Sequence, residues 1–174
     1  MTDKISSGRP EKEIGPLLVK MGLLLGLAES CTGGMISARI TDVSGSSSYF
    51  AGGVVAYDNR VKEEVLGVPA KELELHGAVS QQVASSMARG VKKLLKTDFG
   101  LSVTGIAGPG GGSPEKPVGL VYIALDGPRD NLVKEYHFRG NRSEIRMAAM
   151  EEALEILKRE LIENQKVREI KKCL

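Results

Sequence analysis

Residues 30–62 of this 174-residue sequence contain serine, tyrosine and lysine side chains that could carry out nucleophilic catalysis. The segment 44–48 holds four serines and a glycine, and Tyr57 and Lys62 follow it. A lysine amine that is partly removed from water can take the proton of a serine hydroxyl and so create a nucleophile. Ser30 is a rival candidate, because it stands where an apolar run turns into a predicted helix, a common place for a nucleophile.

Two glycine-rich segments could bind an anion or a developing oxyanion. Thr32, Gly33 and Gly34 open a predicted helix, whose first N–H groups have no partner within the helix and can receive an anion. The second segment, 104–117, is long for a loop in a compact domain, and such loops usually have a function. Plainer interpretations are a helix start capped by Ser30 or Thr32 and a loop without a ligand. The residues of the second segment that could contact a ligand include Thr104, Gly105, Gly108 and Gly110.

Other kinds of chemistry find little support in the sequence. His76 and His137 are not accompanied by a G-x-S-x-G motif, which argues against a Ser-His-Asp triad. Cys31 and Cys173 show no metal-ligand spacing, so no zinc site is expected. The chain has no Trp, three Phe and four Tyr, so stacking on nucleic-acid bases is not expected either.

The charge and hydropathy patterns favour a protein without a membrane segment. The net charge of +2 comes mostly from residues 166–172, which are more typical of a solvated chain end than of a nucleic-acid arm. The longest apolar run, 23–28, is too short to span a bilayer, and the N-terminus lacks the apolar segment of a signal peptide. We therefore expect a cytoplasmic protein that binds neither membranes nor nucleic acid.

Hydrophobic spacing predicts the elements that must position these residues. Helices are expected where apolar residues recur every three or four positions, and strands where short apolar or β-branched runs end in turn residues. Predicted helices cover 11–21, about 34–40, 61–66, 69–75, 80–95 and a last stretch from Asn141 or Ser143 to about Ile162; predicted strands cover 23–28, 49–57, 99–104, 118–125 and 132–138. This order predicts an α/β fold, namely a three-layer α/β/α sandwich with a mixed, mostly parallel sheet of five or six strands.

A single domain is expected, because the chain is shorter than the length at which chains divide into two cores. Residues 1–10 form a predicted loose lead-in, 11–163 the domain and 164–174 a basic tail. Ligands of open α/β sheets bind beyond the carboxyl ends of the strands. The candidate residues are therefore expected to converge on one cavity at one edge of the sheet.

Five ordered segments together resemble the CinA C-terminal domain family over roughly residues 10–160. They are AESCTGG at 28–34, TDVSGSS at 41–47, GGVVAYDNRVKEEVLGV at 52–68, HGAVS at 76–80 and SVTGIAGPGGGSPEKPVG at 102–119. The resemblance implies a nicotinamide mononucleotide deamidase of pyridine-nucleotide recycling, which takes a small nucleotide substrate, releases ammonia and needs no metal or organic cofactor. It also implies homo-oligomers and the single-domain form, without the nucleotide-pyrophosphatase-like domain of longer members.

The same resemblance implies roles for individual residues. Ser47 matches the nucleophile and Lys62 its base, with Ser30 as the rival nucleophile. Roles in the catalytic pocket are implied for Tyr57 and Thr104, and substrate-binding roles for Thr32, Gly33, Gly34, Gly105, Gly108, Gly110 and Arg142. Ala56, Asp58 and Arg60 depart from the family pattern, which changes the charge near the pocket and affects substrate preference more than reaction type.

Two other functions are alternatives. The domain could bind a nucleotide or another protein without turnover, as a nucleotide sensor or a competence- or damage-associated binding domain, which the departures around Asp58 to Arg60 favour. A pure binding domain, however, has no need of a serine and a lysine together. A metal-dependent pyrophosphatase is disfavoured, because such enzymes cluster carboxylates, whereas Glu151, Glu152 and Glu155 spread along a predicted helix.

Overall fold

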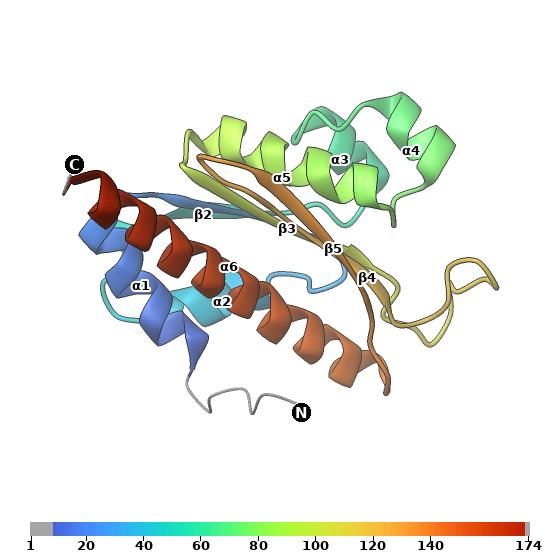
Figure 1. The fold of residues 1–174 in the computed structure, drawn as a ribbon. Helices are drawn as coiled ribbons and strands as arrows, with labels where there is room; N and C mark the ends of the chain where they lie inside the picture. The colour runs from blue at the N-terminus through green and yellow to red at the C-terminus, as the bar shows by residue number, and fades with distance from the viewer. Residues whose placement is uncertain (1–8, 173–174) are drawn as a thin grey trace.

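The computed structural model describes residues 9–172 as helices on both sides of a single sheet (Figure 1). In chain order the elements are α1 (Pro10–Met21), β1 (Leu25–Glu29), α2 (Met35–Thr41), the 3-10 helix η1 (Ser46–Ser48), β2 (Phe50–Val55), α3 (Asn59–Glu64), α4 (Ala70–His76), α5 (Gln81–Leu95), β3 (Phe99–Gly105), β4 (Leu120–Asp126), β5 (Asn131–His137) and α6 (Arg142–Lys172). Each predicted helix and strand is present in the predicted order. Most of the predicted lead-in, and Cys173, lie outside the described residues.

The strands form one sheet in the order β2-β1-β3-β4-β5. β1 pairs in parallel with both β2 and β3, whereas β4 pairs antiparallel with β3 and β5. β1, β2, β3 and β5 therefore point the same way, and β4 runs against them. The prediction of a mixed, mostly parallel sheet within an α/β sandwich is confirmed.

Two layers of helices cover the two faces of the sheet (Figure 1). α1, α2 and α6 lie on one face, and α3, α4 and α5 lie on the other. Successive side chains of a strand point to opposite faces. In β1, Leu25 and Leu27 accordingly join the apolar cluster of α1 and α6, whereas Ala28 joins the cluster of α5. Every residue of β1 is buried, as expected for a central strand that is covered on both sides.

Two glycines let α5 approach its neighbours closely. A Cβ atom built on Gly100 of β3 would lie 2.1 Å from the carbonyl oxygen of Ala88 in α5, and one built on Gly90 of α5 would lie 2.0 Å from the carbonyl oxygen of Leu66. No side chain fits at either distance. Because Leu66 follows α3 directly, this second contact holds the end of α3 against α5.

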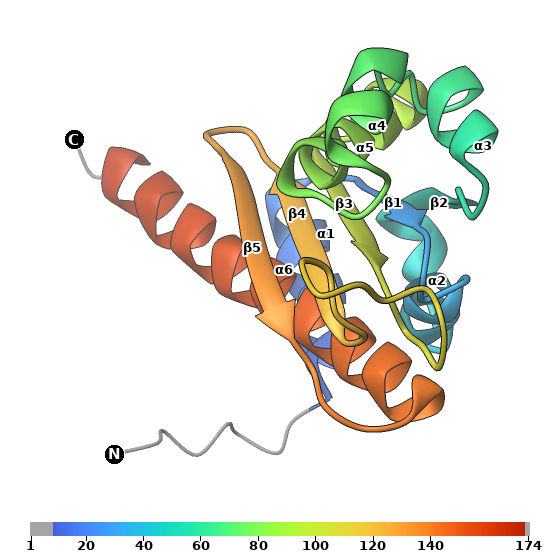
Figure 2. The same cartoon turned by 90° about the vertical axis from the view of Figure 1, so that its right-hand side faces the viewer.

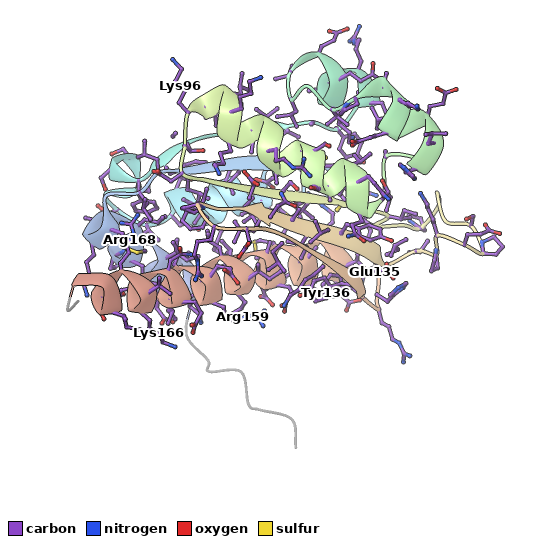
Figure 3. The ribbon with its side chains drawn as sticks, turned by 45° about the horizontal axis from the view of Figure 1, so that its top comes forward. Lys96, Glu135, Tyr136, Arg159, Lys166 and Arg168 are labelled. Atoms are coloured by element: carbon purple, nitrogen blue, oxygen red, sulfur yellow. The ribbon has the colours of Figure 1, made fainter. Side chains whose placement is uncertain are left out.

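Helix α6 continues to Lys172, whereas an end near Ile162 and a loose tail over 164–174 were expected. A tertiary contact explains the difference: the Arg168 guanidinium donates a hydrogen bond of 2.9 Å to the carbonyl oxygen of Met21, at the C-terminal end of α1. Figure 3 shows Arg168 on the last turns of the helix. Neither α6 nor any other described helix is long and apolar enough to cross a membrane.

Candidate active site

A cleft of about 260 Å³ is lined by residues at the edge of the sheet where β1, β2 and β3 end. Its walls are the ends of these strands, the start of α3, the connection between α4 and α5, the start of α6 and the segment 106–119, here called the Gly-rich loop. The predicted site residues that line it are Ser30, Tyr57, Lys62, Thr104, Gly105, Gly108, Gly110 and Arg142. The cleft thus lies beyond the carboxyl ends of parallel strands, where ligands of open α/β sheets bind.

Three further lining residues, Ile106, Ala107 and Gly111, belong to the segment 104–117 that was predicted to bind a ligand. No site role was predicted for the lining residues Cys31, Asn59, Ala78 and Val79. Ala78 and Val79 lie in HGAVS, one of the five sequence segments that resemble the CinA C-terminal domain family. Their presence in this segment was the available signal that they belong to the site. For Cys31 the available signal was its position directly after Ser30.

Ser30 and Thr104 lie side by side on one face of the sheet. The Ser30 N–H donates a hydrogen bond of 2.9 Å to the carbonyl oxygen of Val103, which extends the parallel pairing of β1 and β3 by one residue. Alternation then turns both side chains toward the α5 face. Thr104 Oγ1 donates to the carbonyl oxygen of Ala78 at 2.8 Å, so Thr104 joins β3 to the cleft wall rather than offering a free donor to an oxyanion.

Lys62 enters the cleft from α3 with its side chain 1% exposed. Asp58 caps this helix by accepting a hydrogen bond of 2.8 Å from the N–H of Arg60. The Lys62 Nζ donates to the carbonyl oxygens of Ala56 and Tyr57, at 2.8 and 3.3 Å. Burial lowers the pKa of Lys62, and the negative charge of Asp58 opposes that shift in part.

The hydrogen bonds of Lys62 suit a neutral amine. A neutral amine has two N–H groups and one lone pair, and the carbonyl groups of Ala56 and Tyr57 can take the two N–H groups. The lone pair is then left to accept a proton from a third direction. Because the Lys62 side chain and the Ser30 hydroxyl line the same cleft, the chain brings a proton acceptor to a serine.

Cys31 is buried next to Ser30, and burial shifts its pKa in the opposite direction to that of Lys62. Burial raises the pKa of its thiol to about 11, against smaller effects of backbone hydrogen bonds and Arg146 that lower it. The group therefore stays a neutral thiol near neutral pH, and thiols react as nucleophiles only after deprotonation. Ser30, a residue that is 9% exposed, offers the better candidate in its hydroxyl.

Ser47 does not join Lys62 in the structure. Ser47 lies in η1, before β2 begins, whereas Lys62 follows the end of β2, and the strand of six residues between them spans about 20 Å at roughly 3.3 Å per residue. The expected Ser47–Lys62 pair is therefore not formed within this chain. Ser47 is exposed at the opposite edge of the sheet. Ser44, which precedes η1, and Ser48, its last residue, line a separate cavity of about 540 Å³ beside α1.

The N-terminal end of α2 is occupied by the chain's own carboxylate. Glu29, 1% exposed at the end of β1, accepts hydrogen bonds from the N–H groups of Gly34, Ile36 and Ser37 at 2.9, 3.1 and 2.8 Å. The Ser37 hydroxyl donates to the same carboxylate at 2.7 Å. The predicted anion site at this helix start is therefore wrong: these N–H groups already have a negatively charged partner.

Thr32, Gly33 and Gly34 do not line the cleft, so their expected substrate contacts are not supported. Thr32 is fully buried, and its carbonyl oxygen accepts a hydrogen bond of 2.9 Å from Arg146. The available signal was Glu29 itself, an acidic residue at the end of a buried strand and just before a helix start.

Arg142 closes the cleft from the start of α6. Asn141 caps this helix, because its Oδ1 accepts hydrogen bonds from the N–H groups of Ser143 and Glu144, which resolves the choice left open between Asn141 and Ser143. The Arg142 guanidinium donates to the carbonyl oxygen of Gly108 at 2.7 Å and to the Tyr57 hydroxyl at 3.0 Å. It thereby joins the Gly-rich loop to the start of α3 at the mouth of the cleft.

The basic residues that line the cleft are Lys62 and Arg142, and no Asp or Glu is among the lining residues. Across the described residues, no three His, Cys, Asp or Glu side chains gather in a way that could hold a metal ion. The cleft therefore favours a ligand that carries negative charge, such as a phosphate, at the Arg142 end.

The fold and the cleft define this chain as an α/β protein that presents a serine and a buried lysine at the carboxyl edge of a mixed sheet. Residues 8–161 match the model of the CinA C-terminal domain. The chain therefore belongs to the CinA C-terminal domain family, as the sequence motifs predicted.

Relatives and solved structures agree with this assignment. A CinA-like protein of Geotalea daltonii is 52% identical over 149 residues, which are 86% of this chain and 36% of the relative. A CinA-like protein of Desulfotalea psychrophila is 49% identical over 151 residues, 87% of this chain and 37% of the relative. This chain thus spans only about a third of the length of these curated relatives. The crystal structure of the competence/damage inducible protein CihA from Agrobacterium tumefaciens is 41% identical with a TM-score of 0.82, covering 88% of this chain and 96% of that chain.

Proposed function

We propose that this domain is an amidohydrolase that deamidates nicotinamide mononucleotide, with Ser30 as the nucleophile and Lys62 as its base. The single observation that carries the proposal is the cleft shared by the Ser30 hydroxyl and a lysine whose pKa is lowered by burial. Ser47, the nucleophile implied by the family resemblance, lies at the other edge of the sheet. The substrate itself comes from that resemblance, and the charges in the cleft are compatible with it.

The chemistry would proceed in two halves. The neutral Lys62 amine takes the proton of the Ser30 hydroxyl, and the oxygen attacks the carboxamide carbon of the substrate. The resulting ammonium group returns a proton to the amide nitrogen, so that the C–N bond breaks and ammonia leaves. Water then attacks the acyl-serine ester with Lys62 again as the base, which releases nicotinic acid mononucleotide and restores the hydroxyl.

The charges in the cleft suit this substrate. Its phosphate can pair with Arg142, whose planar guanidinium binds phosphate oxygens well. Its positively charged pyridinium ring would meet no repulsion from Lys62 in the neutral form. Tyr57, which is 62% exposed and bonded to Arg142, provides an aromatic face for that ring at the mouth of the cleft.

The test is to incubate the purified chain with nicotinamide mononucleotide and to measure ammonia and nicotinic acid mononucleotide together. We expect equal amounts of both products. If the nucleotide binds but neither product forms, the alternative applies: a nucleotide-sensing or competence- or damage-associated binding domain.

A further inference from the structure

A lysine of the Gly-rich loop, Lys116, reaches out of the loop to the connection between α4 and α5. Its Nζ donates a hydrogen bond of 2.7 Å to the carbonyl oxygen of Val79 and a second one to the carbonyl oxygen of His76. Figure 2 shows the loop and this connection side by side at the end of the sheet. Because Val79 and residues of the loop both line the cleft, Lys116 joins two of its walls.

The carbonyl groups that receive Lys116 are suited to a cation. His76 is the last residue of α4, and the final carbonyl groups of a helix lack partners within the helix. They also carry the negative end of the helix dipole. The Lys116 side chain is half-buried there, which strengthens charge-assisted hydrogen bonds relative to those in open water.

Hydrogen bonds within the loop fix the backbone that carries Lys116. At its tip, the Ser113 N–H donates to the carbonyl oxygen of Lys116 at 2.9 Å, and the Lys116 N–H donates to Ser113 Oγ at 3.1 Å. At its base, the Gly119 N–H donates to the carbonyl oxygen of Ile106 at 2.8 Å. The backbone that carries the lysine is thus fixed at both ends, so little freedom is lost when the ammonium group binds.

The connection between α4 and α5, which accepts the hydrogen bonds of Lys116, is also bonded to β3 within the cleft. Ala78, next to Val79, accepts the hydrogen bond of the Thr104 hydroxyl. On the other side of the loop, Arg142 binds the carbonyl oxygen of Gly108. The Gly-rich loop is therefore tied at two places by cations, and Lys116 is the one of the two that does not itself line the cleft.

We propose that Lys116 is a positioning residue, whose ammonium group fixes the Gly-rich loop against the wall formed by Ala78 and Val79 and thereby sets the width of the cleft. The expected effect of Lys116 on catalysis rests on the proposed function, whereas its expected effect on the loop does not. Loss of the contact leaves Ser30 and Lys62 in place and loosens a wall against which the substrate packs.

The effect on the loop is tested by amide hydrogen exchange in Lys116→Met, Lys116→Arg and the control Lys71→Met, which changes an exposed lysine on α4. We expect exchange over 106–119 to become about tenfold faster in Lys116→Met, with a Tm within about 3 °C of the wild type. Lys116→Arg, which keeps a cation and its donors, and Lys71→Met should both behave like the wild type. Equal exchange in Lys116→Met and the wild type, or no rescue by arginine, overturns the proposal.

The KM for the substrate is a second measurement, and it would not change if Lys116 only stabilised the fold. With nicotinamide mononucleotide, Lys116→Met should raise KM about tenfold and change kcat by less than about threefold, and Lys116→Arg should restore KM. An unchanged KM in an active Lys116→Met enzyme overturns the positioning role. If the wild type releases no ammonia, the proposed function fails, and the exchange comparison still decides whether Lys116 holds the loop.

Discussion

Burial shifts the pKa values of the side chains in the cleft and so determines which of them can act as a base or as a nucleophile. Removal from water disfavours a charged group, so it lowers the pKa of the Lys62 ammonium and raises the pKa of the Cys31 thiol to about 11. One cleft thus holds an amine that gives up its proton more readily than an ordinary lysine and a thiol that keeps its own proton. The remaining candidate nucleophile is the hydroxyl of Ser30, a residue that lines the same cleft.

Activity should depend on pH through Lys62. Because the neutral amine is the active form, kcat/KM for ammonia release should rise with pH up to the lowered pKa of Lys62 and level off above it, below the pH at which an ordinary lysine titrates. Lys62→Arg, which keeps a permanent charge, should lose activity by about 10²-fold or more at every pH. A pH profile that is flat over this range, or an active arginine variant, would exclude Lys62 as the base.

The Thr32 hydroxyl is fully buried and has no hydrogen-bond partner among the described residues, so it should weaken the fold. Thr32→Val keeps the shape and removes the unpaired group, and we expect it to raise the free energy of unfolding by about 1 kcal/mol with kcat/KM unchanged. The matched control is Thr104→Val, which leaves the Ala78 carbonyl oxygen without its donor and should lower the same free energy by about 1–2 kcal/mol. Urea unfolding measures both. Equal losses in the two variants would refute the assignment of Thr32 as unpaired.

Among the secondary-structure elements, a short helix depends on a strand residue. α2 has seven residues, and its first N–H groups are satisfied by Glu29 of β1 rather than by a residue of its own. The negative carboxylate also compensates the positive end of the helix dipole. Glu29 is thus a structural residue that fixes the turn carrying Ser30 and Cys31.

Glu29→Gln tests this structural role. The amide keeps the size of the side chain and loses the charge, and its NH₂ group faces N–H donors, so the free energy of unfolding should fall by about 2 kcal/mol. Glu63→Gln, on the exposed side of α3, is the control and should change it by less than about 0.5 kcal/mol. A Glu29→Gln protein as stable as the control would show that the buried charge is dispensable.

Periodicity predicted the type and order of the elements well, because alternation and helical spacing are local properties of the sequence. The predicted end of α6 was wrong for the opposite reason, because the last turns of this helix depend on a contact that is not local. The hydrogen bond from Arg168 to the Met21 carbonyl oxygen joins residues far apart in the chain, whereas charge alone suggested a solvated tail. The role of Glu29 was missed for a different reason: its hydrogen bonds are local, but they run to the N–H groups of a helix start that the sequence suggested as a ligand site.

In the molecule as a whole, strand direction determines which candidates meet. Ser30, Thr104 and the residues before α3 lie at or just beyond the carboxyl ends of parallel strands, so they converge at one edge of the sheet. Ser47 precedes β2 and lies at the other edge. The predicted strand 49–57 already separated Ser47 from Lys62 in this way. The resemblance to the family, rather than the pattern of strands, favoured that pair.

The comparison of Ser30→Ala with Ser47→Ala decides whether the cleft is the catalytic site. With nicotinamide mononucleotide as substrate, Ser30→Ala should lower kcat/KM for ammonia release by about 10³-fold or more, and Ser47→Ala should change it by less than about threefold. Both folded variants should keep the wild-type Tm within about 3 °C, since each removes one hydroxyl. Full activity in Ser30→Ala together with loss of activity in Ser47→Ala would contradict the assignment of Ser30 and Lys62.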